Sequence, residues 1–120
     1  MTDAIDTAEY RELIRRNAAA FHANFSRGDI DANGDLAAED ISVISNTVHL
    51  AGRAAFVKRL KRYNEPFPGL QLRDRLIIVD GTGAAVLYRL QGEHGGRFGD
   101  HDATGNLVEA LSGEMFEFND

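Results

Sequence analysis

Residues 107–118 read Leu-Val-Glu-Ala-Leu-Ser-Gly-Glu-Met-Phe-Glu-Phe, and this stretch decides the fold. Its side chains alternate between two faces at a period of two, which predicts a β-strand. One face carries Val108, Ala110, Ser112, Glu114, Phe116 and Phe118. Glu114 is the acid on this face, and a carboxylate buried in a core must be paired, hydrogen-bonded or protonated. A register shift of one residue would instead turn Glu114 toward solvent.

A long helix is predicted near the start of the chain. Asp6 and, three residues later, Glu9 predict a capping box, and Gly28 predicts the helix end because glycine readily adopts the left-handed conformation there. We expect His22 at the surface or at the edge of this helix. The apolar stripe of the helix, at spacings of three and four residues, consists of Tyr10, Ile14, Ala18, Phe21 and Phe25.

Shorter elements are predicted between this helix and the final strand. They are a short helix around 35–38 within residues 29–40, where Gly34 breaks the pattern, a strand at 41–45, a helix from Gly52 or Arg53 that Pro66 and Pro68 stop, a strand at 70–80, a turn at 81–83, a return strand at 84–93 and a polar loop at 95–105. Helices followed by antiparallel strands predict an α+β fold, with the helices packed across one face of a curved sheet.

The composition limits the classes of function. With 120 residues, the chain is expected to form one domain, 1–120, and without cysteine it cannot form disulfides, thiolate metal sites or a cysteine nucleophile. A net charge of −6 argues against nucleic acid as a partner. The lack of a long apolar run and of a signal-peptide pattern predicts a cytoplasmic protein with no membrane partner. We interpret the one basic cluster as a solvated helix face: Lys58, Arg59, Lys61 and Arg62.

Several short motifs, in this order and spacing, resemble the nuclear transport factor 2-like superfamily, especially SnoaL-like polyketide cyclases and relatives of ketosteroid isomerase. The resemblance implies a cone-shaped roll, in which a strongly curved sheet wraps around the long first helix and leaves a pocket at one end. It also implies a homodimer through the outer face of the sheet. The motifs are Arg27-Gly28-Asp29, Ala38-Glu39-Asp40-Ile41, Leu50-Ala51-Gly52-Arg53, Leu90-Gln91-Gly92, Ala103-Thr104-Gly105 and the closing Met115-Phe116-Glu117-Phe118-Asn119-Asp120.

The resemblance also implies a catalytic role for Glu114. It implies a buried acid at this position that donates a hydrogen bond to a developing oxyanion. The isomerase's phenol is replaced by Phe21 and its general base by Ser45, which argues against that isomerase reaction because serine alone cannot act as the base. The cyclases carry a catalytic aspartate on a further strand, whereas this sequence stops at Asp120. We therefore expect the usual final strand to be missing, or the sequence to have been cut short.

The leading hypothesis is a pocket for a small apolar molecule, with no cofactor and no metal. In an enzyme, Glu114 would perform acid–base chemistry on a cyclic or carbonyl substrate. The alternative is a non-catalytic ligand-binding or dimerisation module of the same fold. The acid–histidine cluster of Glu93, His94, Asp100, His101 and Asp102 is interpreted as a solvated loop. The predicted substrate-binding residues are Phe21, Phe25, Ser45, Asn46, His49, Phe56, Tyr63, Tyr88 and Phe116.

Overall fold

The computed structural model describes residues 7–45 and 48–118. Strands β3, β4 and β5 form an antiparallel sheet in that order, while β1 and β2 pair in a separate small hairpin. Within the described ranges, no helix has the length and apolar character to cross a membrane. The elements, in chain order, are α2 (Ala8–Ser26), α3 (Ile30–Leu36), β1 (Ser42–Ile44), β2 (His49–Ala51), α4 (Arg53–Asn64), β3 (Gln71–Asp80), β4 (Gly83–Glu93) and β5 (Leu107–Glu117).

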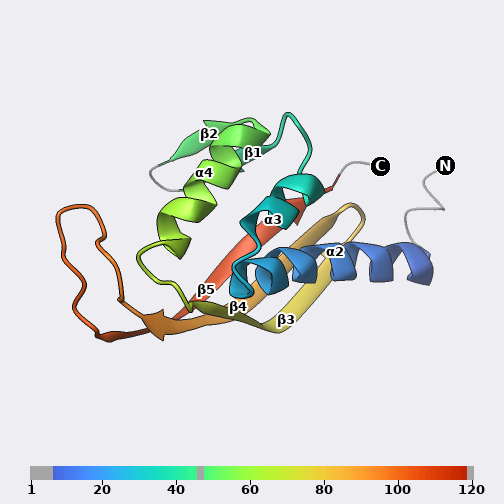
Figure 1. The fold of residues 1–120 in the computed structure, drawn as a ribbon. Helices are drawn as coiled ribbons and strands as arrows, with labels where there is room; N and C mark the ends of the chain where they lie inside the picture. Colours follow the sequence, from blue (N-terminus) through green and yellow to red (C-terminus); the bar gives the residue numbers. More distant parts are fainter. Residues whose placement is uncertain (1–6, 46–47, 119–120) are drawn as a thin grey trace.

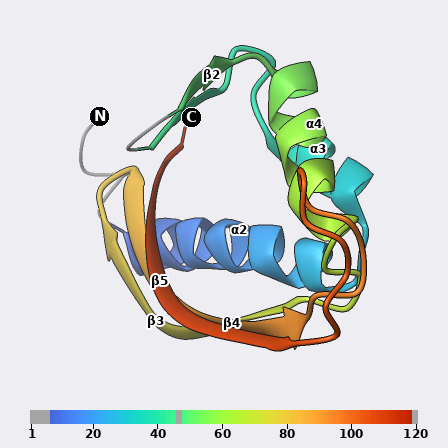
Figure 2. The ribbon, with the colours of Figure 1, turned by 90° about the vertical axis from the view of Figure 1, so that its left-hand side faces the viewer.

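The fold is the predicted α+β cone-shaped roll. The three-stranded sheet curves strongly, and α2 lies across its concave face (Figures 1 and 2). Figure 2 shows α3 and α4 on one side of α2 and the β1–β2 hairpin beyond them. We call the face of the sheet that meets α2 the inner face and the opposite one the outer face.

The long helix begins and ends close to its predicted bounds. Its N-cap is Thr7, whose side chain accepts a hydrogen bond from the backbone N–H of Tyr10, which satisfies one of the free donors of the first turn. The predicted cap, Asp6, lies outside the described residues. Gly28, with φ of 77°, follows the C-cap Arg27 and permits the chain to turn away from the helix.

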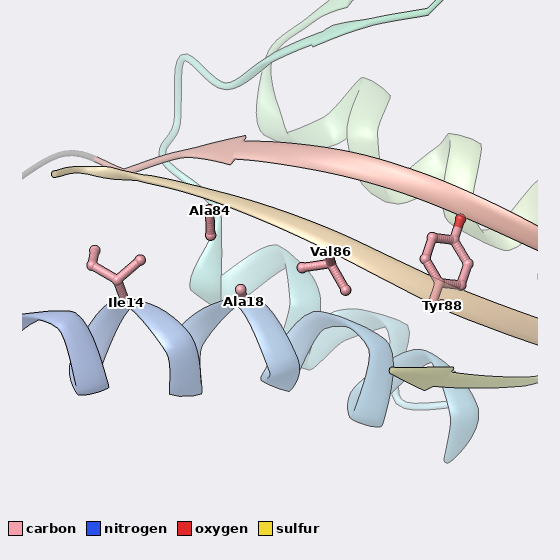
Figure 3. Close-up of a cluster of buried hydrophobic side chains, with 5 residues drawn as sticks. All are labelled: Ile14, Ala18, Ala84, Val86 and Tyr88. Carbon is pink, nitrogen blue, oxygen red and sulfur yellow. The ribbon is translucent and has the colours of Figure 1, made fainter. Parts of the chain in front are cut away.

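The main core lies between α2 and the inner face of the sheet. Figure 3 shows Ile14 and Ala18 on α2 directed at the side chains of β4. Branched and small residues at alternate positions of β4 fill the space beneath the helix, as the period of two predicts. The buried members of this cluster are Ile14, Ala18, Ala84, Val86 and Tyr88.

Helix α3 differs from its prediction. It spans Ile30–Leu36 rather than 35–38, and Gly34 lies inside it instead of breaking it. The Asp29 side chain caps it by accepting a hydrogen bond from the Ala32 backbone N–H. A Cβ added at Gly34 would stand 2.9 Å from Cγ2 of Val57 on α4, so close contact between two helices explains this glycine.

The short strand β2 has no counterpart among the predicted elements, which leave residues 46–51 without a strand. It pairs with β1 in antiparallel register, with Val43 opposite Leu50 and Ile44 opposite His49. Three residues are too few to show a periodic pattern. Asn46 and Thr47, which follow the predicted first strand, lie outside the described residues.

Gly92→Ala is expected to destabilise the fold by about 1–3 kcal/mol, because overpacking forces its neighbours to move. A Cβ at Gly92 would lie 2.9 Å from Cδ1 and 3.0 Å from Cα of Leu70, and a backbone atom cannot rotate away. Gly69→Ala is the matched control, since nothing lies within 4 Å of its added Cβ. Urea unfolding of both variants checks this, and equal stabilities would contradict it.

Candidate active site

Glu114 lies on the inner face of the sheet. In the register of β4 and β5, Val86 faces Glu114 and Tyr88 faces Ser112, and the buried Val86 and Tyr88 belong to the core under α2. The predicted face of residues 107–118 is therefore correct, and the alternative register does not occur. Glu114 is not the buried acid that the resemblance implies, because its side chain is 41% exposed, but a side chain of α2 meets its carboxylate.

That side chain is His22. Its Nε2 lies 2.5 Å from Oε1 of Glu114, and its Nδ1 lies 2.5 Å from Oδ1 of Asp74 on β3. The His22 side chain is 4% exposed, against 19% for Asp74 and 41% for Glu114. The imidazole thus lies between two carboxylates, one from each edge strand, β3 and β5. We call Asp74, His22 and Glu114 the carboxylate–imidazole cluster.

The prediction that His22 is at the surface or helix edge was wrong, since the residue is buried. A signal for burial was present in the sequence. His22 follows Ala18 by four residues, as Ala18 follows Ile14, and residues four apart lie one above the other on the same side of a helix. The same spacing that puts Ile14 and Ala18 in the core puts the imidazole over the sheet.

Opposing effects act on the charge of His22. Burial, the largest of them, lowers its pKa, but the hydrogen bonds and charges of Glu114 and Asp74 together raise the pKa above the ordinary 6.5. A neutral imidazole has only one N–H, whereas an imidazolium has two. Only the imidazolium can donate to both carboxylates at once.

Tyr88 completes the polar group on the inner face. Its ring centroid lies 4.3 Å from that of His22, and Figure 3 shows its hydroxyl on the side of β5. Burial, followed by the charge of Glu114, raises the pKa of Tyr88 to about 12, and the phenol also hydrogen-bonds with Ser112 and Glu114. The phenol stays protonated at neutral pH and can donate a hydrogen bond next to the Glu114 carboxylate.

Aromatic side chains adjoin this polar group. Phe116 of β5 stacks on Phe21 of α2 with ring centroids 5.3 Å apart, and Phe56 of α4 meets the edge of Phe21 at 6.0 Å. Phe116 also lies 6.2 Å from the His22 ring. Three of the predicted substrate-binding residues therefore meet beside the carboxylate–imidazole cluster, and they come from three different elements.

The other predicted residues lie elsewhere. Phe25 belongs to a second cluster of buried residues with Ile30 and Leu70, and Tyr63 packs against that cluster. Tyr63 lies on α4 and Phe25 on α2, and this cluster is distinct from the core cluster of Val86 and Tyr88. Ser45 is exposed beside the β1–β2 hairpin, and His49 is exposed on β2, where it pairs with Ser42. Asn46 lies outside the described residues.

The acid–histidine cluster of the polar loop is spread out. His94 is buried, and its Nδ1 forms a hydrogen bond with the Thr104 hydroxyl. Asp102 forms a salt bridge with Arg97, and the backbone of His101 forms an isolated β-bridge with Phe98. In the part of the chain that the structure describes, no group of three or more histidine, cysteine or acidic residues is arranged to hold a metal ion.

Among the described residues lie two shallow hollows that His22 does not line. One, of about 280 Å³, is lined mainly by the outward-facing Leu76, Ile78, Leu87 and Met115, and Val86 and Glu114 also line it. The other, of about 310 Å³, is polar and lies between the start of α3 and the end of α4. The predicted apolar pocket beside Glu114 therefore stays a prediction.

A model of the SnoaL-like domain matches residues 18–120. The chain belongs to the SnoaL-like family. A solved candidate polyketide cyclase from Xanthomonas campestris pv. campestris is similar to this SnoaL-like protein, with 30% identity, 92% of this chain and 84% of that chain covered, and a TM-score of 0.83. No curated protein matches the chain in sequence.

Two further structures support the fold of this SnoaL-like protein. A candidate SnoaL-like polyketide cyclase from Jannaschia sp. CCS1 has a TM-score of 0.86 at 17% identity, covering 96% of this chain and 83% of that one. An LEH-like epoxide hydrolase from M. tuberculosis has a TM-score of 0.70 at 17% identity, covering 88% and 72%. At these identities the likeness concerns the fold, which is that of the nuclear transport factor 2-like superfamily.

Proposed function

We propose that this protein is an enzyme that performs acid–base chemistry on a small, largely apolar molecule, with Glu114 as the group that exchanges a proton with the substrate. The observation that carries the proposal is the pairing of Glu114 with the buried His22 at 2.5 Å. Despite this pairing, 41% of the Glu114 side chain remains exposed. One end of the cluster is thus anchored in the core while the other can be reached.

The arrangement favours Glu114 as a general base. When Nε2–H of the His22 imidazolium donates to Oε1, Glu114 is the acceptor and therefore the carboxylate form. Its second oxygen can then take a proton from a substrate. Tyr88, which stays protonated, supplies a neutral hydrogen-bond donor beside it. A base and a neutral donor side by side are what proton abstraction next to a carbonyl, or attack of an activated water, requires.

The aromatic neighbours indicate the kind of substrate. Phe56 and Phe116, which are partly exposed and pack on the buried Phe21, offer apolar ring surface next to the cluster, which suits a ring-shaped molecule with few charges. The candidate cyclases and the epoxide hydrolase of similar fold point to cyclic ketones, phenols and epoxides as the first compounds to test. The competing proposal is a module that binds such a molecule without converting it.

A panel of cyclic ketones, phenols and epoxides tests the two proposals together. Binding is followed through the NMR resonances of His22 and Phe116, and conversion is followed by mass spectrometry. We expect at least one class to shift both resonances and to give product. Binding at these resonances without any product across the panel would favour the non-catalytic module.

We further propose that the partner on the outer face of the sheet is a second copy of this chain. That face carries an outer apolar patch of large exposed side chains, and soluble monomers rarely expose such a surface without a function. The patch spans all three strands, so it is broad enough for a sheet-to-sheet contact. Its members are Leu76, Ile78, Leu87, Leu111 and Met115.

Ile78→Lys is expected to weaken self-association at least about tenfold, because a charge would be desolvated in the interface. Sedimentation equilibrium measures the dissociation constant. Leu107→Lys is the control, since Leu107 is exposed on the same face but lies at the far end of β5 from the outer apolar patch. A wild-type protein that stays monomeric throughout the concentration range would contradict the dimer.

A further inference from the structure

An irregularity in β3 determines which way Asp74 points. Asp74 pairs with Tyr88 and Leu76 pairs with Leu87, so Arg75 has no partner on β4. This is a β-bulge, in which one strand carries one extra residue. Because of it, Leu72 and Asp74 face inward before the bulge, and Ile77 and Val79 pack inward after it. With regular alternation, Ile77 facing inward would have turned Asp74 outward.

The carboxylate of Asp74 contacts the imidazole of His22. Its Oδ1 lies 2.5 Å from Nδ1 of His22, on the side of the ring opposite Glu114. The Asp74 side chain is 19% exposed, less than half the exposure of Glu114. The hydrogen bond of Asp74 thus goes to the imidazole, and its charge also acts on Tyr88.

The groups that face the His22 ring come from every strand of the sheet. They are Asp74 from β3, Tyr88 from β4, and Glu114 with the Phe116 ring from β5. The helix packed beside it, α3, contributes Asn33, which bonds Asn24 and the Phe21 carbonyl instead. The charge on His22 is thus balanced by two carboxylates, and Tyr88 remains a neutral phenol.

We propose that Asp74 is a positioning residue, which keeps His22 as an imidazolium with its Nε2–H directed at Glu114 so that Glu114 can act as a base. This inference rests on the proposed function. In the reaction, the proton taken from the substrate goes to the second carboxyl oxygen of Glu114 and returns from there to the product. His22 keeps both of its ring protons throughout, and Asp74 remains the acceptor of the Nδ1–H.

The Asp74→Asn variant separates the charge of Asp74 from its shape. An asparagine amide oxygen can still accept from Nδ1–H, but it no longer stabilises a positive ring. Burial then dominates, so the ring becomes neutral at lower pH. A neutral ring protonated at Nδ1 has lost its Nε2 proton to solvent and presents a bare nitrogen to Glu114. No donor then holds Oε1 of Glu114, so the base would lose the hydrogen bond that positions it.

Nitrogen-15 NMR of the His22 ring in the ligand-free protein tests the proposal without any substrate. In the wild type at pH 7 we expect both ring nitrogens to be protonated. In Asp74→Asn we expect the titration of His22 to move down by about one to two pH units. Asp80→Asn is the matched control, because Asp80 is an exposed acid on the same strand. A wild-type ring with one bare nitrogen at pH 7, or an unchanged titration in Asp74→Asn, would overturn the proposal.

Turnover, once a substrate is found, gives a second readout. We expect the alkaline limb of the pH–rate profile to move to lower pH in Asp74→Asn and not in Asp80→Asn. A uniform loss of rate at every pH, with the limb unmoved, would indicate a merely structural role and overturn the proposal. The NMR result does not depend on activity, so the positioning role and the proposed function can fail separately. The wild-type spectrum decides the matter even if Asp74→Asn does not fold.

Discussion

Glu114→Gln is expected to lower turnover of an accepted substrate by about 10²–10⁴-fold, the usual contribution of a general base. The glutamine carbonyl keeps the size of the side chain and can still accept the His22 Nε2–H, but it cannot take a proton. The fold and substrate binding should change little, so the loss should appear in kcat rather than in KM. Initial rates measured by product formation, together with circular dichroism, check this.

The matched control is Glu109→Gln. Glu109 lies on the same strand but on the outer face, where it pairs with Arg89 at 2.7 Å. Both variants remove one negative charge from β5, so an effect of net charge would appear in both. A Glu114→Gln enzyme within about twofold of the wild-type rate would remove Glu114 from the proposed mechanism.

His22→Leu is expected to destabilise the protein by about 2–3 kcal/mol. Removing one partner of a buried ion pair commonly costs about 3–5 kcal/mol, because the remaining charges lose their hydrogen bonds. We reduce this figure because the Glu114 side chain is 41% exposed and partly screened by solvent. Urea unfolding at pH 6 measures the difference. His49→Leu is the control, since His49 is exposed on β2.

The stability of the wild type is also expected to fall as the pH rises. The pKa of His22 is raised in the folded protein, so folding favours the proton. This contribution is complete below the ordinary pKa of 6.5 and is lost as the pH rises through the higher folded-state pKa. The His22→Leu variant should lack this decline. The unfolding free energies of the wild type and the variant, each plotted against pH, should therefore approach each other above that pH. A constant difference in unfolding free energy between the two proteins at every pH would contradict this link between stability and the pKa of His22.

Much of the fold could be predicted from local patterns. The stripe of α2, the glycine turn between β3 and β4, and the alternation along β5 all express a period or a turn preference that lies within a few residues. The same alternation put Glu114 on the inner face. The limits of α3 and the existence of β2 could not be predicted, because a helix packed on α4 through Gly34 and a strand of three residues depend on contacts with distant segments.

The candidate site was predicted only in part. Glu114, Tyr88 and three phenylalanines were found because each lies at a regular position of a periodic element. Asp74 was not found, since its inward direction depends on the bulge at Arg75 and nothing in Arg73-Asp74-Arg75-Leu76 marks an extra residue. Phe25 and Tyr63 were included because the resemblance alone does not separate the two apolar clusters of the cone.

The sequence by itself determined the two longer helices, the three long strands, their order, the family and the face on which Glu114 lies, since local periodicity and short motifs encode these. Only the tertiary structure decided what Glu114 meets. Residues 22, 74 and 114 are separated by 52 and 40 positions along the chain, and the curvature of the sheet under α2, with the bulge in β3, brings them onto one imidazole ring. Such a contact depends on the packing geometry of three elements, which no single stretch of sequence carries.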